Sequence, residues 1–108
     1  MSSFNKRGES FEKKFALDEE QKFKASVRRN KLVGLWAAEK MGLSGTEAAE
    51  YAKEVIKADF SAPGGEGVFA KIRDDFAAKG VEQSEHQIRR TMEELMATAA
   101  EQIQNEAS

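Results

Sequence analysis

The chain has 108 residues, of which 33% are charged and 40% are apolar, with a formal net charge of −2, one proline and no cysteine. This length suits a single domain, the lack of cysteine excludes disulfides and thiolate catalysis, and no apolar run approaches the ~20 residues of a membrane-spanning helix. Since sixteen residues are alanine, the best helix former, the composition predicts a small all-α protein.

The net charge conceals an uneven distribution along the chain. Residues 1–31 carry nine Lys/Arg against five Asp/Glu, a net charge of +4, whereas residues 32–108 carry eight against fourteen, a net charge of −6. This pattern predicts a basic N-terminal part that contacts an acidic surface and an acidic remainder that stays in solution.

Residues 1–17 are predicted to form a flexible N-terminal arm that becomes helical on binding. Phe4, Phe11 and Phe15 are spaced by seven and four residues, so on a helix their rings share one face. A helix this short is marginal in water without a docking surface, and Gly8 weakens it further. The basic residues on the other sides of this helix are Lys6, Arg7, Lys13 and Lys14. The alternative, an ordinary frayed chain end, is equally compatible with this stretch taken alone.

A long first helix is predicted from Asp18 to Met41. Asp18 and Gln21 form a capping-box pattern, and Gly42 is a natural helix stop. Gly34 costs about 1 kcal/mol relative to alanine in a helix interior, so we expect a neighbouring helix to approach closely there. One apolar stripe holds Phe23, Val27, Gly34, Ala38 and Met41, and a second holds Leu32, Leu35 and Trp36. Two apolar faces predict that neighbouring helices pack on more than one side of the second half of this helix.

Three further helices follow the first one, which covers about residues 18–41. They are predicted over about residues 44–60, 66–79 and 84–104. No strand pattern and no internal repeat is present, and the short loops favour antiparallel neighbours. The predicted fold is therefore all-α: a small four-helix bundle with a long first helix and a flexible N-terminal arm. The arm comprises residues 1–17, and the four-helix domain comprises residues 18–108.

The starts of two of these helices carry capping-box patterns, in which Ser and a Glu or Gln three residues later satisfy free backbone amides. The pairs are Ser44 with Glu47 and Ser84 with Gln87. Apolar residues recur at helical spacing in all three helices. The residues predicted to face the core are Ala48, Tyr51, Ala52, Val55 and Ile56, then Val68, Phe69, Ile72 and Phe76, and then Ile88, Met92, Leu95, Met96, Ala99 and Ile103.

Residue types that could support catalysis or bind a metal are few. His86 is the single histidine, and it lacks the further ligands that a zinc site requires. The adjacent acidic pairs Asp74–Asp75 and Glu93–Glu94 diverge by about 100° on a helix, so neither pair can flank a substrate bond. We therefore predict that the protein is not an enzyme and has no metal site.

Neither of two possible phosphate-binding segments is convincing. Gly64–Gly67 precedes a helix but lacks the lysine and the strand of a phosphate-binding loop, and a flexible hinge is the better interpretation. The basic run 28–31 stands in a chain with an isoelectric point of about 5.5 and without a nucleic-acid-binding motif. We predict no cofactor and no nucleic-acid partner, and weak contact with an adenine nucleotide is left open.

The most suitable partner for the arm is a groove on another protein, which its phenylalanines would enter as anchors. Binding of the arm to a membrane surface is disfavoured because Glu9 and Glu12 interrupt its basic residues. A helical adaptor whose basic arm binds some other acidic complex, or nucleic acid, is the alternative function.

The most distinctive segments lie in the arm and in the first two helices. They are FEKKFA at residues 11–16, RRNKLVGLWAAE at residues 28–39 and YAKEV at residues 51–55. Together with the later amphipathic helices, these segments resemble the alphaproteobacterial ATPase inhibitor family, the zeta subunit of the F-type ATP synthase.

The resemblance implies a protein inhibitor of ATP hydrolysis. Its arm would insert into the catalytic head of the synthase, between the alpha and beta subunits near gamma, and block rotation in the hydrolytic direction. The implied contacts are apolar for the rings and ionic for the cations, and by position they fall on Phe4, Lys6, Arg7, Phe11, Lys13, Lys14 and Phe15. The implied location is cytoplasmic, peripheral to the inner membrane through the synthase, without membrane insertion. We expect the free protein to be a monomer.

The residues after the arm are assigned a structural role. The anchor residues are Phe23, Arg28, Arg29, Asn30, Lys31, Leu32, Gly34, Leu35 and Trp36. Leu32, Leu35 and Trp36 are expected inside the bundle, with the three cations at its rim. Relatives commonly carry a polar residue, often histidine, before the Asp-Glu run, whereas this chain has Leu17, which cannot titrate. A pH switch at that position is therefore not predicted.

Overall fold

The computed structural model describes residues 17–106, and this part of the chain contains four α-helices and no strand. The helices are α2 (Glu19–Lys40), α3 (Gly45–Ala58), α4 (Glu66–Lys79) and α5 (Glu85–Glu106). Two short 3-10 turns, η1 (Asp59–Ser61) and η2 (Pro63–Gly65), connect α3 to α4. The predicted all-α fold with four helices is confirmed.

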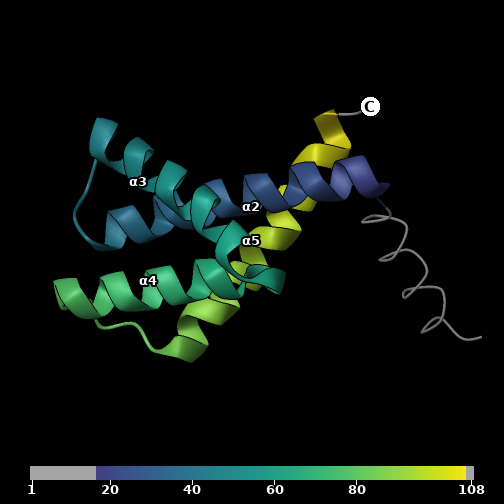
Figure 1. Cartoon of the computed structure of the whole chain (residues 1–108). Coiled ribbons are helices and arrows are strands. Elements are labelled where there is room, and N and C mark those ends of the chain that lie inside the picture. Colours follow the sequence, from purple (N-terminus) through teal and green to yellow (C-terminus); the bar gives the residue numbers. More distant parts are fainter. Residues whose placement is uncertain (1–16, 107–108) are drawn as a thin grey trace, which may run out of the picture.

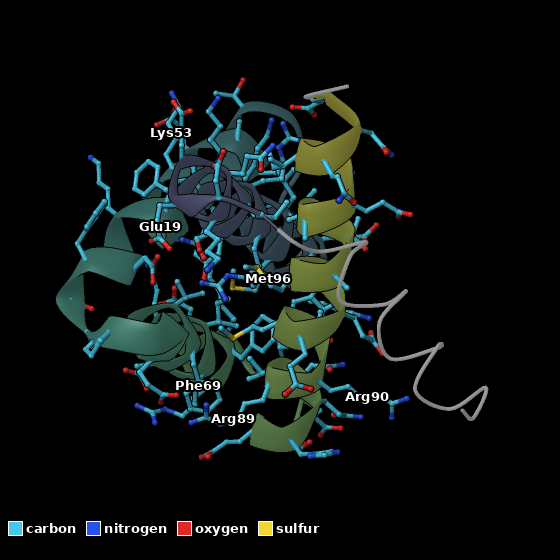
Figure 2. All side chains as sticks on the ribbon, turned by 90° about the vertical axis from the view of Figure 1, so that its right-hand side faces the viewer. Glu19, Lys53, Phe69, Arg89, Arg90 and Met96 are labelled. Carbon is cyan, nitrogen blue, oxygen red and sulfur yellow. The ribbon has the colours of Figure 1, made fainter. Side chains whose placement is uncertain are left out.

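The long helix α2 is the centre of the arrangement, because α3 and α5 both pack along it. α2 and α3 form an antiparallel hairpin, as the short loop predicts, whereas α5 lies steeply across α2 (Figure 1). In the perpendicular view α5 again runs across both α2 and α4 (Figure 2). The C-terminal end of α5 consequently lies beside the first half of α2, close to the point where the arm is attached.

The core lies between the four helices and is built from residues of all of them. Its members are Val33, Ala37, Ala38, Tyr51, Val55, Val68, Phe69, Ile72, Phe76, Ile88 and Met92. The predicted inward face of α4 is confirmed in full. On α3 and α5 the predicted stripes also face inward, but their edges at Ala48, Ile56, Leu95 and Met96 are only half-buried. Removal of these apolar side chains from water is the main force that holds the helices together.

Gly34 lies at the closest approach between α2 and α3. A Cβ atom at this position would stand 2.7 Å from the Cα atom of Ala52 and 3.3 Å from the Cβ atom of Val55. The missing side chain therefore allows the two helices to pack backbone against backbone, which confirms the expectation of a close helix neighbour.

Side-chain capping boxes define the starts of α2 and α5, whereas α3 and α4 begin without a side-chain cap. The predicted capping box before α5 is present. Ser84 Oγ accepts a hydrogen bond from the backbone N–H of Gln87 at 3.0 Å, and the backbone N–H of Ser84 donates to Gln87 Oε1 at 2.8 Å. The box predicted for Ser44 and Glu47 is wrong, since the Ser44 side chain makes no capping hydrogen bond. Gly45 has a φ of +56°, and this left-handed residue interrupts the backbone geometry that a capping box needs.

Several expectations for burial along α2 need correction. Phe23 is 62% exposed and does not belong to the core, because the first turns of α2 are only partly covered by its neighbours. Leu32, Leu35 and Trp36 are half-buried rather than inside the bundle. The fully buried positions of this half of the helix are the smaller residues Val33, Gly34, Ala37 and Ala38. Close packing of α2 on α3 favours small residues at the contact, so larger ones lie at its edges.

A polar and aromatic contact joins the N-terminal ends of α4 and α5. The guanidinium of Arg89 donates to both carboxylate oxygens of Glu66, at 2.8 and 3.0 Å. Its central carbon also lies 3.7 Å from the ring centroid of Phe69 (Figure 2). This contact holds α5 across α4 at the end of the molecule opposite to the α2–α5 contact.

Candidate functional site: the base of the arm

The seven residues predicted to contact a partner all belong to the first fifteen positions, outside the described residues. They are Phe4, Lys6, Arg7, Phe11, Lys13, Lys14 and Phe15. The structure does describe the helix that follows the arm and the contacts that hold this helix in place. These contacts fix the position of the start of α2, which is the point where the arm joins the helical body.

The attachment point is a complete capping box at the start of α2. Asp18 Oδ1 accepts a hydrogen bond from the backbone N–H of Gln21 at 2.7 Å, and Gln21 Oε1 accepts one from the backbone N–H of Asp18 at 3.1 Å. Glu19 and Glu20 in the first turn also favour the positive end of the helix dipole. The helix therefore begins at Glu19, directly after the predicted capping residue Asp18.

One polar contact joins the first half of α2 to the C-terminal end of α5. The Arg28 guanidinium donates to Gln102 Oε1 at 2.6 Å and to Glu106 Oε1 at 3.0 Å, and it lies 2.8 Å from Glu106 Oε2. The hydrogen bond from Arg28 lowers the pKa of Glu106 below its ordinary value. Arg28 was expected at the rim, and the structure shows that it connects two helices there.

A second polar contact, largely buried, joins α2 to the end of α3. The Asn30 side chain is only 1% exposed; its Nδ2 donates to Asp59 Oδ2 at 2.9 Å, and its Oδ1 accepts from Arg29 Nε at 2.7 Å. Arg29 Nη2 lies 4.0 Å from Asp59 Oδ1. Burial lowers the pKa of Arg29, and the charge of Asp59 opposes this change. Asn30 thus connects α2 to the end of α3 from a buried position.

Asp59 is the structural residue that the sequence did not reveal. It lies twenty-nine positions after Asn30, at the start of η1. No local periodicity relates the two positions, because α3 ends at Ala58 and the chain tightens into a 3-10 turn there. The second helix is predicted to extend to about residue 60, whereas α3 ends at Ala58 and Asp59 begins the 3-10 turn η1.

The remaining predicted anchors have different surroundings. Trp36 packs at the edge of the core, its ring centroid 5.6 Å from that of Phe76 at an interplanar angle of 58°. Lys31 is exposed. The structure therefore places Arg28 in the contact with α5 and Arg29 and Asn30 in the contact with Asp59. It leaves Lys31 and Phe23 at the surface.

The histidine and the acidic side chains of residues 17–106 do not gather into a metal-binding cluster. They form no group of three or more that could hold a metal ion, and His86 is exposed in the first turn of α5. The acidic side chain of Asp75 is engaged with Tyr51 and Lys71, at 2.7 and 3.0 Å. In this part of the chain, no helix combines the length and the apolar character needed to cross a bilayer.

Comparison with known proteins finds similarity to solved structures and to one family model. A solved structure titled "Solution NMR structure of the protein" is 49% identical to the chain and has a TM-score of 0.69; the match covers 78% of this chain and 95% of that one. A search of curated proteins finds no match. The family model of ATPase inhibitor subunit zeta matches residues 1–102, which include both the arm and nearly all of the helical body. On this coverage, the chain belongs to the ATPase inhibitor subunit zeta family.

Proposed function

We propose that the protein inhibits ATP hydrolysis by the F-type ATP synthase through its N-terminal arm. In this proposal residues 1–17 enter the interface between a catalytic and a non-catalytic subunit of the head, near the rotor, and block rotation in the hydrolytic direction. The observation that supports it most is the family match from residue 1, because a match that begins there includes the arm as well as the body.

The chemistry of the arm suits such an interface. Phe4, Phe11 and Phe15 supply an apolar face, and the four cations of the arm supply charge that can pair with carboxylates of the head. Large aromatic anchors supply most of the binding energy in many interfaces, whereas ionic contacts at the rim mainly speed up association and set orientation.

The helical body would act as a rigid base for the arm. α2 starts at a capping box, is tied to α5 through Arg28 and to α3 through Asn30, and packs closely on α3 at Gly34. A mechanical block needs such a base, because an inserted segment on a loosely attached helix would move with the rotor.

Removal of the arm tests this mechanism. A chain that lacks residues 1–17 is expected to lose inhibition of isolated catalytic heads, and its helical circular dichroism should stay close to that of the full chain, because the described contacts are retained. The full-length chain, prepared in parallel, is the control. Undiminished inhibition by the shortened chain would contradict the assignment of the activity to the arm.

A further inference from the structure

An open, mostly apolar groove lies beside the attachment point of the arm. It has a volume of about 410 Å³ and runs between the first half of α2, the end of α3 and the C-terminal end of α5. The lining residues are Phe23, Val27, Ile56 and Ile103, with Lys24, Arg28, Lys31 and Glu106 at the edges. The volume falls in the range in which proteins accommodate side chains or small ligands.

Phe23 gives this groove the character of a docking site. Its side chain is 62% exposed, and Phe60 is the only other large apolar side chain that is exposed among residues 17–106. A single exposed apolar residue is ordinary, but an exposed aromatic ring beside an apolar groove is typical of a surface that a partner covers.

The edge of the groove is basic, in contrast to the acidic body that surrounds it. Three of the charged lining residues are basic, namely Lys24, Arg28 and Lys31, and one is acidic, namely Glu106. The carboxylate of Glu106 already forms an ion pair with Arg28. Lys24 and Lys31 are both exposed. The groove is therefore complementary to a segment that presents apolar side chains flanked by carboxylates.

The groove is continuous with the base of the arm. A neighbouring hollow is lined by three residues at the start of α2 and by three residues of the groove itself. The former are Asp18, Glu20 and Gln21, and the latter are Lys24, Ile103 and Glu106. The groove therefore lies next to the point at which the arm joins the helical body, within reach of a partner that holds the arm. The arm itself is a poor occupant, because residues 1–17 carry four Lys/Arg against two Glu and would meet the lysines of the groove with like charge.

We propose that this groove docks an acidic amphipathic segment on the outside of the catalytic head and so forms a second contact beside the inserted arm. This inference rests on the proposed function. Phe23 inserts its ring between apolar side chains of that segment, while Lys24 and Lys31 pair with its carboxylates. The second contact lowers the dissociation rate of the inhibitor and restricts the direction from which the arm enters.

Substitutions at exposed positions of the full-length chain test the docking site without disturbing the core. The variants are Phe23→Ser and Lys31→Glu. The matched controls are Phe60→Ser, which changes the other exposed phenylalanine, and Lys79→Glu, which reverses an exposed charge at the far end of α4. The inhibition constant and the dissociation rate are measured on isolated catalytic heads, and circular dichroism confirms that each variant is folded.

Both groove variants are expected to raise the inhibition constant roughly tenfold or more, with Phe23→Ser acting mainly on the dissociation rate. The controls should change it less than about twofold, since they lie outside the groove. Inhibition by the unaltered chain together with unchanged constants for both groove variants would overturn the docking site and leave the proposed function intact. A failure of the unaltered chain to inhibit or bind the heads would overturn the proposed function itself.

Two other results would assign the groove to a different occupant and overturn the inference. Stronger inhibition by the groove variants would mean that the groove holds the chain's own arm, which the substitutions release. A dimer that dissociates on Phe23→Ser, seen by sedimentation, together with an unchanged inhibition constant, would mean that the groove binds a second copy of the chain.

Discussion

Asn30 shows how a single side chain can couple two helices in this protein. Apart from the hydroxyl-bearing Tyr51, it is the one buried residue with a polar side chain among residues 17–106. Its amide uses both its donor and its acceptor, toward Asp59 and Arg29 respectively. A buried polar group is tolerated only when its hydrogen bonds are satisfied, and the three residues satisfy one another.

Asn30→Ala is expected to lower the free energy of unfolding by about 1–3 kcal/mol, because Asp59 and Arg29 each lose a hydrogen-bond partner in a poorly hydrated site. Chemical denaturation monitored by circular dichroism measures this change. Asn105→Ala, at an exposed position of α5, is the control and should stay within about 0.5 kcal/mol of the unaltered chain. Equal stabilities of the two variants would show that the buried contact contributes nothing.

The arm supplies a second prediction at the scale of single residues. Replacing both Phe11 and Phe15 by alanine should weaken binding to the catalytic head by about 1.5–3 kcal/mol for each ring that is buried in the interface. Titration of ATPase inhibition measures the effect. Phe60→Ala provides the control, because this ring is exposed on the body, 78% of its surface being accessible. If the double variant inhibits as well as the control, the rings are not anchors.

α2 is the element that determines how the arm is presented. Its start is defined by the Asp18–Gln21 capping box, and its end by Met41 and by Gly42, whose φ of +80° cannot continue a helix. Between these ends the helix has different neighbours on its two halves, α5 beside the first and α3 beside the second. The second half packs on α3 backbone to backbone at Gly34.

Gly34→Ala tests the close packing of α2 on α3. Alanine improves helix propensity by about 1 kcal/mol, but its Cβ would stand 2.7 Å from the Cα of Ala52. A backbone atom cannot turn aside as a side chain can, so we expect the overpacking cost of about 1–3 kcal/mol to prevail. Thermal and chemical unfolding should show a net loss of stability.

Glu39→Ala, at an exposed position of the same helix, serves as the control and should change stability by less than about 0.5 kcal/mol. A Gly34→Ala variant more stable than the unaltered chain would show that the helices separate at little cost.

At the scale of the whole molecule, α5 crosses α2 and α4 and pairs with one of them near each of its ends. Arg89 on α5 meets Glu66 of α4 near one end, and Glu106 on α5 meets Arg28 of α2 at the other. Membership of an inhibitor-subunit family makes the protein a regulatory one and not an enzyme, in agreement with the sequence prediction. A protein of this kind requires a stable shape and accessible contact surfaces.

The two terminal ion pairs predict a loss of stability in acid. Hydrogen bonds from Arg89 and Arg28 lower the pKa of Glu66 and of Glu106 in the folded protein. The contribution of the two ion pairs to the free energy of unfolding is therefore fully present above the ordinary pKa of glutamate. It is lost as the pH falls through the lowered pKa values of Glu66 and Glu106. The midpoint of thermal unfolding should decrease between about pH 6 and about pH 3.

Variants that lack one of the two carboxylates test whether the ion pairs cause this decrease in the midpoint of thermal unfolding. The decrease should be smaller in Glu66→Gln and Glu106→Gln than in the unaltered chain, because these variants have no carboxylate to protonate. Glu39→Gln, at an exposed glutamate of α2, should behave like the unaltered chain. The same decrease in all four proteins would exclude the two ion pairs as its cause.

By itself the sequence determined the number of helices, their approximate bounds, the need for a close neighbour at Gly34 and the resemblance to the inhibitor family. These features depend on interactions within a few residues, such as the i, i+3 and i, i+4 spacing of apolar side chains and the capping boxes at Asp18 and Ser84. Local interactions of this kind can be recognised without knowledge of the rest of the chain. The contacts assigned to the residues of the arm remain predictions, because these residues lie outside the described part of the chain.

Only the tertiary structure decided which faces of α2 are covered. It buried the small residues Val33 and Ala37, left Phe23 at the surface, paired Asn30 with Asp59 and laid α5 across α2. These outcomes depend on groups that are far apart in the chain and meet only after the helices pack, so helical periodicity carries no information about them. The groove beside Phe23 is one such outcome, since three helices must come together to form it.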